Sequence, residues 1–286
     1  MRSKVLWLLW LGVAAGASAC SEAPPAAPPK PICDGPPDLR LGFRVVPPLE
    51  RVTWGAQVLH ENGSYFLFVS GDCNYWVRQT QDRWADVRSG RLDEEQALDL
   101  SEALHYGRWA EFGGLWEDLT SVIADGPAWI FHDATSAVFC LNSCEGTDLP
   151  PEFAEMKKQA VSWTDRLWQE GTSVGGPLRL TAVRLEEGAT PLAPPSAWPV
   201  PSVSLAGISI SEGESALQGY GEAVLITEGV DELREIRRMH RDVKPPATFW
   251  YNYIPFDEAG AFYRACYRDT VPFENEYGLV PYPGEQ

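Results

Sequence analysis

The stretch AWIFHDATSAVFCLNSCEGTDLPPEFAEMKKQAVSWTDRLWQEG, residues 128–171, contains the two patterns that decide the fold class. Two apolar runs, 128–132 and 137–141, flank the turn residues Asp133-Ala134. Short apolar runs on either side of a turn predict an antiparallel β-hairpin.

The second half of this stretch predicts an amphipathic helix over 151–170. Its large apolar residues recur at intervals of three and four, which places them on one face of a helix. These residues are Phe153, Met156, Ala160, Trp163 and Leu167. Gly171 is expected to end the helix. A hairpin followed by a helix with one buried face indicates an α+β fold.

The residues before this stretch predict two more hairpins. Asn62-Gly63 is a strong turn signal, and Gln81-Asp82 marks a second turn. The expected strands are 52–59, 64–70, 74–80 and 83–88.

A helix is expected between Asp93 and Gly107, because Asp93 and Gln96 have the spacing of a capping box. Residues 39–174 therefore form a first unit with the order β-β-β-β-α-β-β-α.

Residues 175–286 form a second, β-rich unit that begins at Gly175-Gly176. A Pro-rich segment, 189–202, is either a linker or a long surface loop. A helix is expected over 231–241, and residues 255–257 are expected to be a hairpin turn. The expected strands are 178–185, 206–210, 223–227, 248–254 and 261–267. The fold class is thus α+β, with antiparallel sheets of hairpins and a few packed helices in two subdomains.

The amino terminus, MRSKVLWLLWLGVAAGASAC, has the pattern of a secretion signal. Arg2 and Lys4 precede an apolar run over 5–15, which is shorter than the roughly 20 apolar residues that span a bilayer. Ala17-Ser18-Ala19-Cys20 resembles the lipobox of bacterial lipoproteins, although Ala17 stands where the family more often has Leu.

This resemblance implies cleavage before Cys20, a diacylglyceryl group on its sulfur and acylation of the new amine. The chemistry needs a thiol at that position, because a thiolate takes up the lipid. Ser21, rather than Asp, at the next position resembles the signal for the outer membrane, with the protein facing the periplasm or the cell surface. The alternative is an ordinary signal peptide cleaved after Ala19, with Cys20 coincidental.

Residues 20–38 contain the lipidated cysteine and a Pro/Ala-rich tether, which favours an extended chain. A small α+β module behind such a tether resembles the layout of uncharacterised envelope lipoproteins, and this likeness implies no activity. Removal of Arg2 and Lys4 with the signal takes the formal charge from −17 to −19. Such a charge argues against nucleic acid as a partner.

Five cysteines remain after Cys20, in a compartment that permits disulfides. Cys140 and Cys144 are the best local pair, because a turn brings such neighbours close enough to bond. Cys33 could pair with Cys73 or with Cys266. A metal site at Cys140 and Cys144 would need more ligands than His132 nearby.

Chemistry-bearing motifs are sparse. The sequence has no G-x-S-x-G, H-E-x-x-H, P-loop or Rossmann pattern. A thiol site built from His132 and Cys140 is one alternative, and a turn beside a structural disulfide is the favoured interpretation. No cofactor or metal is expected.

One helix concentrates positive charge in this acidic chain. Its cations, with those just after it, are Arg234, Arg237, Arg238, Arg241 and Lys244. They form either a docking patch for an anionic envelope partner or a helix end whose cations offset its dipole. We therefore expect a lipid-anchored envelope protein that binds or assembles without catalysis. The alternative is an envelope hydrolase or thiol enzyme with a non-standard site.

Overall fold

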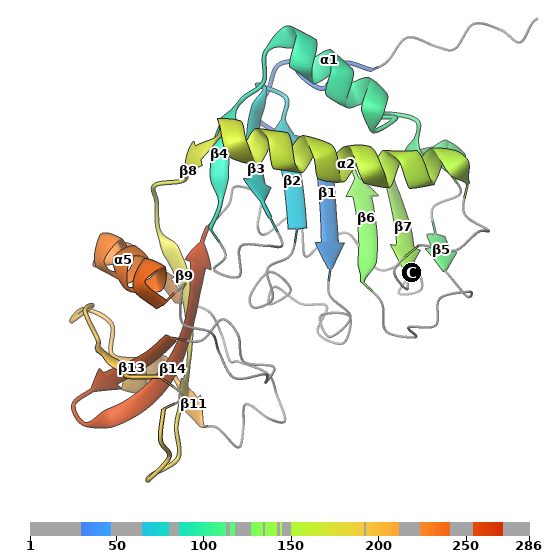
Figure 1. Ribbon diagram of the computed structural model, residues 1–286. Helices are drawn as coiled ribbons and strands as arrows, with labels where there is room; N and C mark the ends of the chain where they lie inside the picture. The colour runs from blue at the N-terminus through green and yellow to red at the C-terminus, as the bar shows by residue number, and fades with distance from the viewer. Residues whose placement is uncertain are drawn as a thin grey trace, which may run out of the picture.

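The computed structural model describes residues 30–46, 65–79, 86–112, 115–117, 127–133, 135–141, 144, 150–191, 193–211, 224–240 and 254–270. Within these residues it has two open sheets and packed helices, which confirms the α+β class (Figure 1). The predicted signal, Cys20 and the strand expected at 52–59 lie outside the described residues.

The larger sheet has eight strands in the order β5-β7-β6-β1-β2-β3-β4-β8. Its strands are β1 Leu39–Val46, β2 Tyr65–Ser70, β3 Asn74–Arg78, β4 Arg88–Arg91, β5 Leu115–Glu117, β6 Ala128–His132, β7 Ala137–Leu141 and β8 Thr172–Ser173. Neighbouring strands are antiparallel except β5 and β7, which are parallel. The predicted hairpin of β6 and β7 is confirmed in full.

Strand β1 lies in the middle of this sheet, although we expected no strand there. Its sequence, LRLGFRVV, alternates apolar and polar residues, the pattern of a strand with two different faces. Leu41 and Phe43 pack toward the helices, and Arg44 points to the other face. This alternating segment comes directly after the Pro-rich residues assigned to the tether, and for that reason we did not predict a strand there.

Helices α1 (Glu94–Ala103) and α2 (Pro151–Glu170) cover one face of the large sheet (Figure 1). The predicted stripe of α2 is buried throughout, and the capping box of α1 is present. A 3-10 helix, η2 (Trp109–Phe112), completes this layer.

Gly171 does end α2, but for a different reason from the one we expected. Its φ of −75° is ordinary for any residue, so no left-handed cap is formed. A side chain at Gly171 would instead lie 3.0 Å from the Leu167 carbonyl oxygen and 3.1 Å from the Cβ of Arg88. Glycine fits here because α2 ends close against strand β4, where a side chain would be tightly placed.

The smaller sheet has the order β10-β13-β14-β9-β11, and β12 pairs with β9 outside this path. Its strands are β9 Leu178–Arg184, β10 Ser196–Ala197, β11 Ile210–Ser211, β12 Val224–Ile226, β13 Ile254–Glu258 and β14 Ala261–Asp269. Helix α5 (Val230–His240) packs on it through Leu233 and Ile236.

Two expectations for the second unit are wrong. Residues 255–257 lie inside β13, where Phe256 is fully buried, and the turn is at Ala259-Gly260. Both turn residues have positive φ, and the Gly260 N–H donates to the side chain of Asp257 at 2.9 Å.

The strand expected at 206–210 is mostly a short helix, α3 (Leu205–Ile208). The carboxylate of Glu258 accepts hydrogen bonds from the amides of Leu205 and Ala206, at 3.1 and 3.0 Å. Glu258 lies more than fifty residues away in the chain, so local sequence does not reveal this cap.

The Pro-rich segment is a packed loop rather than a linker. Trp198 meets the ring of Phe256 edge-on at 5.0 Å, and its indole N–H donates to the carbonyl of Val203 at 2.6 Å.

Candidate functional site

The predicted docking patch on α5 lies where the two sheets meet, and its inner face is built around one carboxylate. Asp269, at the end of β14, is fully buried. Arg234 donates to its Oδ1 at 3.1 and 2.6 Å, and Arg237 donates to its Oδ2 at 3.2 Å. We call Asp86, Arg234, Arg237 and Asp269 the junction cluster.

The junction cluster joins the second sheet to the first unit. Asp86, which lies just before β4, forms an ion pair with Arg237. The Val87 N–H donates to Asp269 at 3.3 Å. Arg234 also donates to the carbonyl oxygens of Val174 and Gly176, at 3.2 and 2.9 Å. The cluster therefore ties α5 and β14 to β4 and to the chain that connects the sheets.

This geometry corrects the docking-patch interpretation for two of its five residues. The side chain of Arg237 is 5% exposed and that of Arg234 is 20% exposed. Both arginines form ion pairs with carboxylates of the same chain. A buried guanidinium requires such a partner, so these two side chains are not available to an external anion. Arg238 is exposed beside Glu235, and Arg241 and Lys244 lie outside the described residues.

A half-open pocket of about 260 Å³ borders the junction cluster. Its lining is Asp86, Ser173, Asp231, Arg234, Glu235, Arg237 and Arg238. The lining contains three arginines and three carboxylates, so the pocket has no excess of positive charge that would favour an anion.

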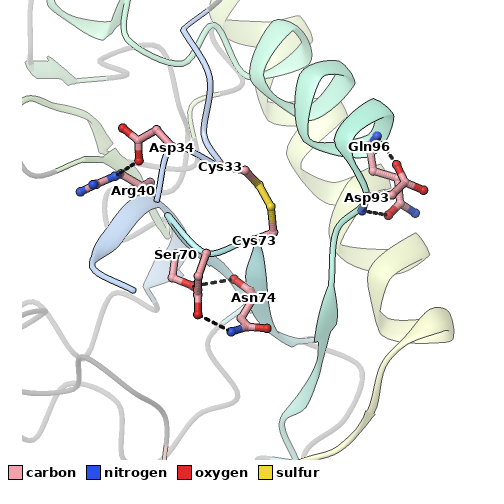
Figure 2. The surroundings of a disulfide bond; sticks show 9 residues. Cys33, Asp34, Arg40, Ser70, Cys73, Asn74, Asp93 and Gln96 are labelled. Carbon is pink, nitrogen blue, oxygen red and sulfur yellow. Dashed lines mark hydrogen bonds and ion pairs between the residues drawn. A yellow bond between two sulfur atoms is a disulfide. The ribbon is translucent and has the colours of Figure 1, made fainter. Parts of the chain in front are cut away.

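Both disulfides among the described residues agree with the pairings expected from the sequence. Cys140 pairs with Cys144 as predicted, and Cys33 pairs with Cys73, which settles the choice left open by the sequence (Figure 2). Cys266 is a buried thiol in β14.

The Cys33–Cys73 disulfide lies at the turn between β2 and β3 (Figure 2). Beside it, the Gly35 N–H donates to the Gly71 carbonyl at 3.0 Å, and the Gly71 N–H donates to the Asp38 carbonyl at 2.9 Å. These hydrogen bonds hold the segment before β1 against the turn between β2 and β3.

The predicted tether, 20–38, is therefore too long. Ile32 is fully buried in the core beneath α1 and α2. The Ser101 hydroxyl donates to the Lys30 carbonyl at 2.6 Å, and the Lys30 ammonium lies 5.2 Å from the centre of the Tyr106 ring. Residues 30–38 thus belong to the folded domain.

His132 and Cys140 do not form a thiol site. They lie on adjacent strands but on opposite faces of the sheet, since Cys140 packs beneath the helices and His132 contacts the ring of Phe68 on the other side. Burial, with Arg44 nearby, lowers the pKa of His132 to about 3. Asp133 accepts from the amides of Thr135 and Ser136 and forms the predicted turn.

One serine–histidine contact was not visible in the sequence, because its members are far apart in the chain. The Ser196 hydroxyl lies 3.5 Å from Nε2 of His240, and burial lowers the pKa of His240. Ser196 lies on β10 and His240 at the end of α5.

No protein-family model matches the chain, and searches of curated proteins and of solved structures find no similar protein. In the part of the chain that the structure describes, no cluster of three or more His, Cys, Asp or Glu residues is arranged to hold a metal ion. None of the described helices is long and apolar enough to cross a membrane.

Proposed function

We propose that the protein is a lipid-anchored component of the bacterial cell envelope that acts by binding another envelope molecule, a protein or a polymer, rather than by catalysis. One observation supports the anchoring part of the proposal: the Cys33–Cys73 disulfide joins the chain to the large sheet thirteen residues after Cys20. A covalent joint at that place passes tension on the anchor directly into the sheet.

The disulfides also support export, because such bonds persist mainly outside the cytoplasm. With Ser21 after the lipidated cysteine, the proposed location is the outer membrane. Residues 30–38 are joined to the folded domain by buried Ile32, by the disulfide of Cys33 and by backbone hydrogen bonds, so the tether is the segment between Cys20 and Lys30. Ten residues span at most about 36 Å, which keeps the domain close to the bilayer.

Labelling of growing cells with palmitate tests the anchor. Wild-type protein should take up the label and partition into membranes, and the Cys20→Ala variant should do neither. The variant still carries Ala17-Ser18-Ala19, which an ordinary signal peptidase can cleave, so it remains an exported control. Label in the variant would contradict the proposal.

Cross-linking in intact cells tests the binding role. A specific envelope component should be recovered with the wild-type protein and recovered less well with the exported Cys20→Ala variant. Repeated recovery of nothing above background would contradict a binding role.

The contact between Ser196 and His240 favours the hydrolase alternative. A neutral imidazole beside a hydroxyl is the arrangement that activates a serine nucleophile. This alternative predicts that a fluorophosphonate probe labels the wild-type protein but not Ser196→Ala. Equal labelling of both proteins, or of neither, would exclude Ser196 as a nucleophile.

A further inference from the structure

We propose that the end of the large sheet that carries the Cys33–Cys73 disulfide faces the lipid surface, and that the second sheet points away from it. This inference rests on the proposed lipid anchor at Cys20. The disulfide end thus lies next to the bilayer surface, and the rest of the molecule is accessible to other partners.

The first step is the point where the chain enters the fold. Lys30 is held by the Ser101 hydroxyl of α1, and Ile32 is buried beneath α1. Cys33 is then bonded to Cys73. The chain between Cys20 and the domain therefore ends at one fixed place, beside α1 and the turn between β2 and β3 (Figure 2).

The second step is the length of that chain. A span of at most about 36 Å from Cys20 to Lys30 is comparable to the size of the domain itself. A lipid on Cys20 therefore keeps the Lys30 end of the domain within about 36 Å of the headgroups, whereas the far end of the second sheet can lie further away.

The third step is the direction of the strands. Cys73 directly precedes β3 and Asp86 precedes β4, and these neighbouring strands are antiparallel. The disulfide and the junction cluster therefore lie at opposite ends of the large sheet. The five residues of β3 separate them by about 17 Å.

The fourth step is the second sheet, which continues away from the junction cluster. Strand β9 begins next to Gly176, which Arg234 holds, and its seven residues extend for about 23 Å. Figure 1 shows this sheet at the opposite side of the molecule from α1. The turn at Gly188 lies beyond the far end of β9, beside the Gly260 turn.

The charge of the disulfide end agrees with a domain held by its tether alone. Asp38 and Glu102 are exposed there together with Lys30 and Arg91, and Arg40 is paired with Asp34. This end therefore has no basic patch that would attract anionic headgroups, and the proposed orientation depends on the point where the tether joins the domain. The far end instead carries a groove lined by 184–191 and 260–262.

The test uses energy transfer from the protein to the membrane. Glu102 on α1 and Glu187 beyond β9 are both exposed glutamates, so they form a matched pair of labelling positions. Each is replaced in turn by azidophenylalanine and coupled to a donor dye. The lipidated full-length protein is then reconstituted on phosphatidylethanolamine/phosphatidylglycerol vesicles that contain an acceptor lipid.

The expected result is that transfer from position 102 exceeds transfer from position 187 by about twofold or more, because up to about 40 Å of strand separates the two ends. Equal transfer, or stronger transfer from position 187, would overturn the orientation. Flotation of the vesicles tests the lipid anchor separately from the orientation. Wild-type protein that floats no better than Cys20→Ala would overturn the anchor and the orientation together, whereas flotation with the reversed transfer order would overturn the orientation alone.

Discussion

The two ends of the large sheet are held by different chemistry. At one end the Cys33–Cys73 disulfide bonds the incoming chain to the turn between β2 and β3. At the other end the junction cluster holds the second sheet through ion pairs and hydrogen bonds. A disulfide acts mainly by restricting the unfolded chain, whereas a buried ion pair depends on every partner being present.

This difference suits the proposed anchor. A covalent joint resists tension on the tether without requiring a particular pH or ionic strength. The junction cluster is not on the path from the proposed anchor to the large sheet. Its role is to hold the two sheets of the chain together.

The largest effect is expected at the junction cluster. Asp269→Asn leaves two arginines without their buried carboxylate, and such losses cost about 3–5 kcal/mol of unfolding free energy. Urea denaturation measures the change. Asp231→Asn is the matched control, because Asp231 is 98% exposed and lies 3.7 Å from Arg234. The control should lose less than about 1 kcal/mol, and equal losses in both variants would contradict a buried cluster.

Loss of the Cys33–Cys73 disulfide should lower the unfolding free energy nearly as much as Asp269→Asn does. Replacing Cys33 and Cys73 by serine opens a loop with a sequence separation of 40, for which chain entropy predicts a loss of about 4 kcal/mol. The same change at Cys140 and Cys144, separated by 4, should cost about 2 kcal/mol. Urea denaturation of the two double variants measures the two losses of unfolding free energy. A larger loss in the Cys140/Cys144 variant would contradict the prediction that the longer loop contributes more stability.

Mild acid should weaken the middle of the sheet rather than either end. His132 has a folded-state pKa near 3, below the unfolded value of about 6.5. Between these values the unfolded chain binds a proton that the folded protein does not, so stability falls as the pH falls below about 6.5.

From pH 7 to pH 5 the loss should be about 2 kcal/mol. Denaturation of wild type and His132→Gln at both pH values measures it. The variant should lose less over this interval, although it starts from a lower stability. An unchanged pH dependence in the variant would assign the effect to other groups.

The smallest effect is expected at the cap of α1, the helix that holds Lys30. Asp93→Ala removes the hydrogen bond from the Gln96 amide, measured at 2.7 Å, and should cost about 1 kcal/mol. Asp99→Ala, on the exposed side of the same helix, serves as the control and should change stability little. A cost at Asp99 as large as that at Asp93 would point to helix charge rather than to the cap.

Local patterns predicted much of this fold. The stripe of α2, the capping box of Asp93 and the hairpin around Asp133 depend on residues close together in the chain, and each is confirmed. The Cys140–Cys144 pair was predictable for the same reason.

The failures involve contacts between distant residues. Glu258 caps α3 from another strand, and Phe256 is drawn into the core although its neighbours resemble turn residues. The docking-patch interpretation is corrected for Arg234 and Arg237 for the same reason. A basic helix predicts an acidic partner, but the sequence alone does not show that Asp269 and Asp86 of the same chain satisfy its inner arginines.

Mass spectrometry of the N-terminal peptide of the protein extracted from membranes tests the central claim most directly. The account predicts a chain that begins at Cys20 and carries a diacylglyceryl group on the sulfur, with an acyl chain on the amine. A mature chain with unmodified Cys20, or one that begins at another residue, would contradict it.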